Sequence, residues 1–145
     1  MLMGEYQHTI DPKGRLFMPA KLRDVLGGSF ILSKGLDGCL FVYDKEQWHL
    51  LETKLSSLPM TNKNARGFSR FFFSGAADAE CDKQGRILLP ANLRAFAGLD
   101  KNVVIVGVGN RAEIWDAERW QSYNDENADD VDALAEQLAD MNMGI

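Results

Sequence analysis

A duplicated segment constrains this chain more than any other feature of its sequence. IDPKGRLFMPAKLR occupies residues 10–23, and CDKQGRILLPANLR repeats the pattern at residues 81–94. When residues 11–27 are aligned with residues 82–98, eight of the seventeen positions are identical. Two repeats are too few for a solenoid, which needs about three or more stacked units to be stable. We therefore expect one body with internal pseudo-twofold symmetry.

Each repeat begins with the residues of a tight turn. Asp11, Pro12 and Gly14 match the preferences of a type I turn closed by a glycine with positive φ. Asp82 and Gly85 keep the essential positions of that turn in the second repeat. Because apolar stretches flank both turns, we predict a β-hairpin in each repeat. The predicted hairpin strands are residues 4–10 with 15–18, and 78–81 with 86–89.

The rest of each repeat predicts a short helix and a second pair of strands. Pro19 and Pro90 stand at the start of the helices, and Gly27 and Gly98 at their ends. Each repeat therefore has the predicted order β-β-α-β-β. The second strand pairs are predicted at residues 29–34 with 39–43 and 102–109 with 112–115. Longer helices are predicted at 45–58, with Asp44 as the cap, at 62–75, after Asp116, and in part of 129–141.

The charge is distributed unevenly along the chain. The net charge is −5, yet residues 1–70 carry ten basic and seven acidic side chains, whereas residues 121–145 carry seven acidic and no basic ones. The acidity therefore belongs to the tail, and the body remains able to bind phosphates. We divide the chain into a first unit with its following helices at 1–70, a second unit with its following helix at 71–124, and an acidic tail at 125–145.

The sequence offers little to an enzyme or a metal site. His8 and His49 have no counterparts in the other repeat and no metal-ligand spacing, and no phosphate-binding glycine motif follows a strand. Cys39 and Cys81 lie beside apolar residues, without CxxC spacing, so we expect both to be buried. We expect no catalytic activity and no cofactor. With neither a secretion signal nor an apolar run of membrane-spanning length, the expected location is the cytoplasm.

Two interpretations of the repeated Asp-x-x-x-Arg pattern remain open. In the structural one, Arg15 folds back onto Asp11, and Arg86 onto Asp82, and each pair closes its own turn. In the functional one, the first turn presents Lys13 and Arg15 to the groove of a DNA duplex. Lysine then contacts phosphates, and arginine hydrogen-bonds a guanine edge.

The second turn is the weaker cationic tip. Gln84 replaces Lys13 and Asn92 replaces Lys21, although Lys83 remains. We interpret the first turn as the part specialised for nucleic acid and the second as a possible subunit contact. The candidate DNA-binding residues are Lys13, Arg15, Lys21, Arg23, Lys83 and Arg86, and the turn residues are Asp11, Gly14, Asp82 and Gly85.

The segments GEYQHTIDPKGRLFMPAKLR and DKQGRILLPANLR closely resemble the MraZ family of bacterial transcription regulators over essentially the whole chain. The resemblance implies an α+β fold of two tandem SpoVT-AbrB-like swapped-hairpin units that form a barrel-like body. It also implies a closed homo-oligomeric ring, commonly an octamer, that binds short direct repeats in double-stranded DNA at the nucleoid. The promoter concerned is that of the division and cell-wall gene cluster, which such a protein itself represses.

Two other functions compete with a DNA-binding repressor. One is a ring-forming scaffold in which the Asp-x-x-x-Arg motifs hold subunits together. The other is an antitoxin of the AbrB type that neutralises a partner with its acidic tail. In each case we expect the aromatic residues to lie in the core or at subunit contacts rather than on a base-stacking surface. These are Trp48, Trp115, Trp120 and residues 71–73.

Overall fold

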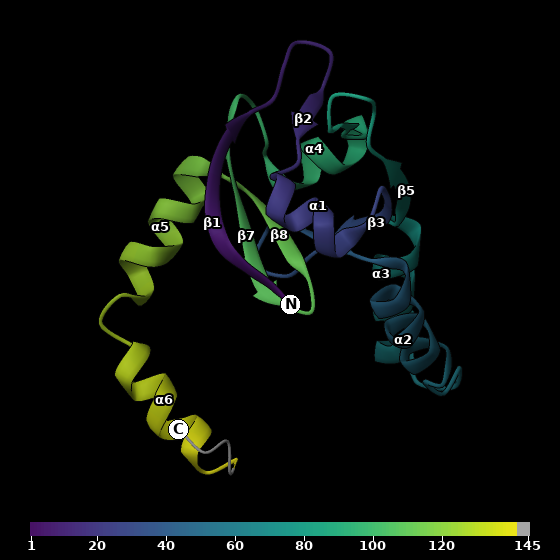
Figure 1. The fold of residues 1–145 in the computed structure, drawn as a ribbon. Helices are drawn as coiled ribbons and strands as arrows, with labels where there is room; N and C mark the ends of the chain where they lie inside the picture. The colour runs from purple at the N-terminus through teal and green to yellow at the C-terminus, as the bar shows by residue number, and fades with distance from the viewer. Residues whose placement is uncertain (142–145) are drawn as a thin grey trace.

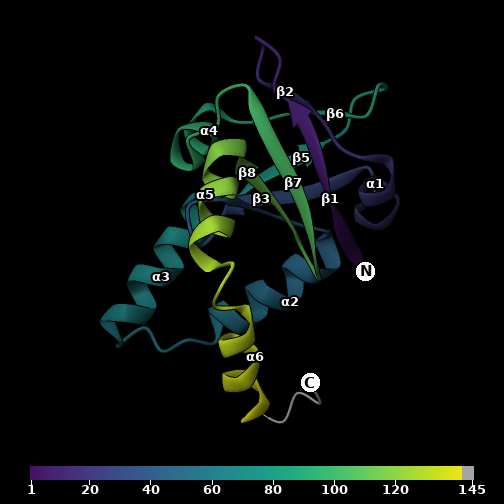
Figure 2. The ribbon, with the colours of Figure 1, turned by 90° about the vertical axis from the view of Figure 1, so that its left-hand side faces the viewer.

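The computed structural model describes residues 1–141 as an α+β fold (Figures 1 and 2). The first repeat and its following helices form β1 (Leu2–Thr9), β2 (Arg15–Phe17), α1 (Ala20–Leu26), β3 (Ser29–Lys34), β4 (Leu40–Tyr43), α2 (Lys45–Ser56) and α3 (Lys63–Ser74). The second forms β5 (Ala77–Glu80), β6 (Arg86–Leu88), α4 (Ala91–Ala97), β7 (Asn102–Gly109), β8 (Ala112–Asp116), α5 (Ala117–Asn127) and α6 (Val131–Ala139). The predicted order β-β-α-β-β is confirmed in both repeats.

The strand order carries the expected pseudo-twofold symmetry. The main antiparallel sheet has the order β1-β7-β8-β4-β3-β5, and β2 pairs with β6 in a separate two-stranded ribbon. Replacing each strand by its counterpart in the other repeat leaves both orders unchanged. The symmetry axis therefore passes between β4 and β8 and between β2 and β6. The two repeats fold as one interleaved body.

The two predicted β-hairpins are wrong, although their turns are present. Backbone hydrogen bonds close the first turn, from Gly14 to Asp11 (2.9 Å) and from Asp11 to Arg15 (3.0 Å), but the flanking strands then separate. β1 pairs over its whole length with β7, and β5 pairs with β3. The three-residue β2 could satisfy only a fraction of the backbone groups of the eight-residue β1, whereas β7 matches its length. The hairpins are thus exchanged between repeats, as the family resemblance implies.

The interleaved strands and short helices enclose the main core. Leu16 and Ile87 face each other on the inner side of the ribbon and are buried. Leu22 of α1 and Leu93 of α4 pack into the same cluster. Because equivalent side chains from both repeats fill one core, each repeat completes the hydrophobic interior of the other.

A second apolar cluster attaches the longer helices to the sheet. It contains Phe41, Tyr43, Leu55, Phe72 and Trp115. Asp44 caps α2 by accepting a hydrogen bond from the Gln47 backbone N–H (2.7 Å), as its sequence predicts. The expectation that aromatic residues belong to the core is confirmed for Phe72 and Trp115. Trp48 and Trp120 are partly buried, and Phe73 is exposed.

The two ends of the body differ in what they present. Both turns lie at one end, the upper end in Figures 1 and 2, whereas α6 projects from the opposite end. The acidic segment is helical over Val131–Ala139, as predicted, and residues 142–145 lie outside the described range. Among the described helices, none combines the length and the apolar character that a membrane crossing requires.

Candidate nucleic-acid interface

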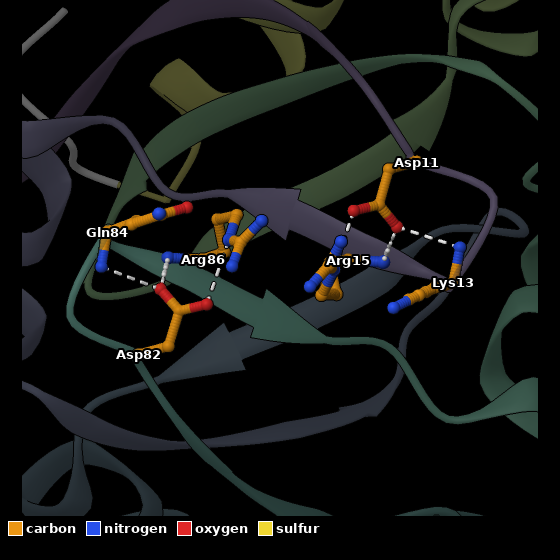
Figure 3. Close-up of polar contacts among 6 residues, drawn as sticks. All are labelled: Asp11, Lys13, Arg15, Asp82, Gln84 and Arg86. Atoms are coloured by element: carbon orange, nitrogen blue, oxygen red, sulfur yellow. Dashed lines mark hydrogen bonds and ion pairs between the residues drawn. The ribbon is translucent and has the colours of Figure 1, made fainter.

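Each Asp-x-x-x-Arg motif closes its own turn by the same hydrogen bonds. Oδ1 of Asp11 accepts from the backbone N–H groups of Lys13 and Arg15, both at 2.9 Å, and Oδ2 accepts from Nε of Arg15 at 2.6 Å. Oδ1 of Asp82 accepts from the backbone of Gln84 and Arg86, again at 2.9 Å, while Arg86 Nε lies 2.8 Å from Oδ2. Figure 3 shows the two arrangements side by side. The structural interpretation of the motif is confirmed.

These hydrogen bonds keep both aspartates ionised. The hydrogen bond from the Arg15 backbone N–H is the main cause that lowers the pKa of Asp11 below its ordinary value of 3.8, and the Arg15 side chain lowers it further. The Arg86 backbone and side chain act on the pKa of Asp82 in the same order. Each arginine is therefore held by a full negative charge.

The turn glycines are covered by arginines from the opposite repeat. Gly14 and Gly85 have φ of +82° and +81°, a region that favours glycine. A Cβ atom on Gly14 would lie 3.1 Å from the guanidinium carbon of Arg94, and one on Gly85 would lie 2.9 Å from that of Arg23. The Nε atoms of these arginines donate to the backbone oxygens of Leu89 (3.1 Å) and Met18 (2.9 Å).

This crossed packing gives Arg23 a structural position that the sequence did not reveal. Arg23 is a predicted DNA-binding residue, and part of its hydrogen-bonding capacity is used within the protein. Arg94 was absent from the predicted site, although its repetition of Arg23 was visible in the aligned motif. Further backbone bonds join the repeats beside these contacts, from Met18 to the oxygen of Gly85 and from Leu89 to that of Gly14.

The ribbon of β2 and β6 presents one face to the outside. Arg15 stands opposite Leu88, and Phe17 opposite Arg86, in the antiparallel register. Phe17 is 47% exposed and Leu88 is 63% exposed, while the Arg86 guanidinium lies 5.9 Å from the centre of the Phe17 ring. We call these four residues the outer ribbon face. In Figure 3 its two arginines lie between the two aspartates. The sequence did not single out Phe17 or Leu88.

The predicted lysines are exposed and have no ion-pair partners in the described range. Lys13 and Lys83 are exposed in the two turns, and Lys21 is exposed on α1. Within residues 1–141 the ion pairs are Arg15 with Asp11, Arg86 with Asp82, and Arg111 with Glu113, so none uses a lysine.

The remaining chemically active residues form no competing site in residues 1–141. His49 is exposed and His8 is partly buried, and no cluster of three or more metal-ligating side chains is found in this range. Cys39 is buried as expected, and burial raises the pKa of its thiol to about 12. The same expectation was wrong for Cys81, which is only partly buried, because it lies just beyond the end of β5 at the edge of the sheet.

Comparisons with known proteins agree with the duplicated fold. The family described as "MraZ protein, putative antitoxin-like" matches the chain twice, over residues 1–71 and 72–142. The chain is 61% identical to the transcriptional regulator MraZ of Heliobacterium modesticaldum, with 99% of this chain and all of that protein covered. It is 56% identical to the transcriptional regulator MraZ of Pelotomaculum thermopropionicum, with both chains fully covered. The chain therefore belongs to the MraZ family.

Proposed function

We propose that this chain is a sequence-specific, double-stranded DNA-binding transcription regulator that reads DNA with its outer ribbon face. The two relatives described above are named transcriptional regulators, and this chain matches them over their full length. Two arginines lie on this face, and Lys13 and Lys83 are exposed in the turns next to it. Arginines and lysines are the side chains that most often contact guanine edges and phosphates.

The observation that carries the proposal is how Arg15 and Arg86 are held. Each uses Nε to bond its own aspartate, and no hydrogen bond from the Nη atoms of either is found within residues 1–141. A guanidinium has five N–H donors, so the Nη groups remain available for O6 and N7 of guanine. The Asp bond fixes the plane of the guanidinium in advance, which reduces the entropy lost when DNA binds.

The shape and composition of the ribbon suit the major groove. That groove admits a two-stranded β-ribbon, and other regulators read DNA with one. Phe17 and Leu88 supply exposed apolar surface next to the arginines, and such surface can contact the methyl group of thymine. We assign contacts with DNA phosphates to Lys13, Lys21, Lys83 and Arg23.

A single ribbon makes few contacts, so the proposal includes assembly. Several ribbons held in a homo-oligomeric ring, with an octamer as the expected form, bind short direct repeats more tightly because the effective concentration is high. The target is the promoter of the chain's own division and cell-wall gene cluster, which it represses at the nucleoid in the cytoplasm. The acidic α6 lies at the end of the body opposite the turns, away from the DNA in this arrangement.

The test compares wild type, Arg15→Ala and Lys45→Ala on a duplex carrying the chain's own promoter and on a scrambled duplex. Lys45 is an exposed basic residue at the start of α2, so its replacement controls for charge alone. Loss of a bidentate guanine contact lowers affinity by about 5- to 150-fold. We expect this loss for Arg15→Ala and near wild-type binding for Lys45→Ala. The wild-type log–log salt slope should be steeper than about −3.

The same samples distinguish DNA binding from the scaffold function. Light scattering should give Arg15→Ala the same mass as wild type, since Arg15 pairs with Asp11 inside its own chain. If Arg15→Ala binds DNA as well as wild type, the ribbon is not the reading surface. If it loses the assembly instead, the motif serves subunit contacts and the scaffold function is correct.

A further inference from the structure

We propose that α6 of one molecule docks on the tip of the α2–α3 helical hairpin of a second molecule of this chain. The proposal deepens the self-association within the proposed function, but uses none of the ribbon residues. It rests on two surfaces at the end of the body opposite the turns (Figures 1 and 2). One is an acidic helix in which no residue is buried, and the other is a basic groove.

The helix α6 presents its apolar side chains to solvent. Val131 is 59% exposed, Leu134 is 48% exposed and Leu138 is 39% exposed, and no residue of the helix is buried. Their spacing of three and four residues places them on one side of the helix. Isolated helices shorter than about 12–15 residues are marginal in water, and α6 has nine. A partner that covers this stripe would stabilise the helix.

The tip of the α2–α3 hairpin has an apolar surface with basic side chains at its border, which could receive this helix. A groove of about 250 Å³ runs between the loop and α3, and Leu58, Met60 and Ala65 are among its lining residues. Met60 is 85% exposed, and Phe68 on α3 is also exposed. Arg66 and Arg70 line the same groove, so the apolar surface has a basic border. We call this surface the tip groove.

The charges of the two surfaces are complementary. Residues 125–140 carry seven carboxylates and no basic side chain. Residues 45–74, which contain both hairpin helices, carry five basic and two acidic side chains, a net charge of +3. The opposite charges of the acidic helix and the basic groove favour encounter of the two, and the like charges of two α6 helices disfavour their docking on each other.

The occupant has to be another molecule because α6 lies on the other side of its own body. In Figure 1 the α2–α3 hairpin lies at the right of the body, whereas α6 lies at the left, below α5. The preceding helix α5 is anchored there, since Trp120 Nε1 donates to Glu5 (3.0 Å) and the Trp115 and Trp120 rings lie 5.2 Å apart. Each molecule thus offers one helix and one groove. Such head-to-tail contacts close into a ring or extend into a filament.

The experiment breaks the two halves of the contact separately. Leu134→Glu with Leu138→Glu places carboxylates on the apolar side of α6, and Met60→Glu with Arg70→Glu places carboxylates in the tip groove. We call these two proteins the spoiled variants. All four side chains are exposed, so both variants should fold. Val25→Glu with Leu36→Glu, exposed residues outside both surfaces, is the matched control. Masses are measured by light scattering, without DNA, so that the result does not depend on DNA reading.

We expect wild type and control to assemble, and each spoiled variant to give the mass of a single chain. An equal mixture of the two spoiled variants should give twice that mass and no more, because only one intact helix and one intact groove remain per pair. The proposal is wrong if either variant keeps the wild-type mass, if the mixture stays monomeric, or if wild type is itself a monomer. Loss of DNA binding by Arg15→Ala with intact assembly would leave it untouched.

Discussion

The two turns, residues 11–15 and 82–86, are built by the same hydrogen bonds but present different side chains. In both, one carboxylate accepts two backbone N–H groups and an arginine Nε. The first turn adds Lys13 at its tip, where the second has Gln84. The bonds common to both serve the fold, because they are present whichever residue stands at the tip. A functional difference between the repeats must come from what surrounds those bonds.

The ribbon adds a second difference between the repeats. Arg15 lies opposite Leu88, whereas Arg86 lies opposite Phe17, with its guanidinium 5.9 Å from the ring centre. A cation above an aromatic ring is attracted to it. Arg86 therefore has a partner in the protein besides Asp82, whereas the charge contact of Arg15 within residues 1–141 is with Asp11 alone. This comparison makes Arg15 the freer of the two arginines for DNA.

The largest effects are expected from the glycines, and they test the equivalence of the two turns. Gly14→Ala and Gly85→Ala each place a Cβ at positive φ and against a guanidinium, at 3.1 and 2.9 Å. We expect each to lower the free energy of unfolding by about 1–3 kcal/mol, measured by urea denaturation. Gly28→Ala should change it by less than about 0.5 kcal/mol, since φ is not positive there and, apart from its chain neighbours, no atom of residues 1–141 lies within 4 Å of the new Cβ.

The same glycine variants also separate fold from function. If the first turn reads DNA, Gly14→Ala should lower DNA affinity more than Gly85→Ala at equal loss of stability. Stability that falls for only one of them would contradict the twofold equivalence of the Arg23 and Arg94 contacts.

An intermediate effect is expected from exchanging the tip residues. Lys13→Gln makes the first turn resemble the second, and Gln84→Lys does the reverse. Each phosphate contact contributes about −0.9 to the log–log salt slope, so Lys13→Gln should flatten the slope by about that amount and weaken binding about three- to tenfold. Gln84→Lys should change both quantities in the opposite direction if the second turn also lies against the DNA. An unchanged slope for Gln84→Lys would restrict DNA contact to the first turn.

The smallest effect concerns pH. Folding lowers the pKa of Asp11 and Asp82 below 3.8, so their ionised forms stabilise the native state above that pH. This contribution disappears as the pH falls through 3.8 toward the lowered pKa of each group. Asp11→Asn and Asp82→Asn should each make the urea midpoint less sensitive to pH between about 3 and 5, and by similar amounts. A midpoint whose acid sensitivity is unchanged in both variants would show that these pairs do not govern it.

Local chemistry made most of the elements predictable. Asp44 before a helical pattern predicted the cap that accepts from Gln47, and Gly98 after α4 predicted the left-handed helix end at φ +62°. The Asp-to-Gly turns and the return of Arg15 to Asp11 are also local, since they span only five residues. The family resemblance added the exchange of hairpins, which no local pattern contained.

The partners of strands and arginines could not be predicted from local patterns. A period of two tells which side of β1 is buried, but not whether β2 or β7 lies beside it. The contact between Arg94 and Gly14 joins residues eighty positions apart, and Arg94 looks like any basic residue at the end of a short helix. The exposure of Phe17 and Leu88 could not be predicted from the sequence, because apolar residues in a strand usually lie in the core.

The interleaved sheet has a consequence for how the chain folds during synthesis. β1 is synthesised first, but its partner β7 ends at Gly109. The β1–β7 pair therefore cannot form until most of the chain has left the ribosome. β3 likewise waits for β5, and β2 for β6. Contacts between distant residues slow folding and leave strand edges unpaired in the meantime. Because the main core contains side chains from both repeats, the first repeat cannot complete that core until most of the chain has been made.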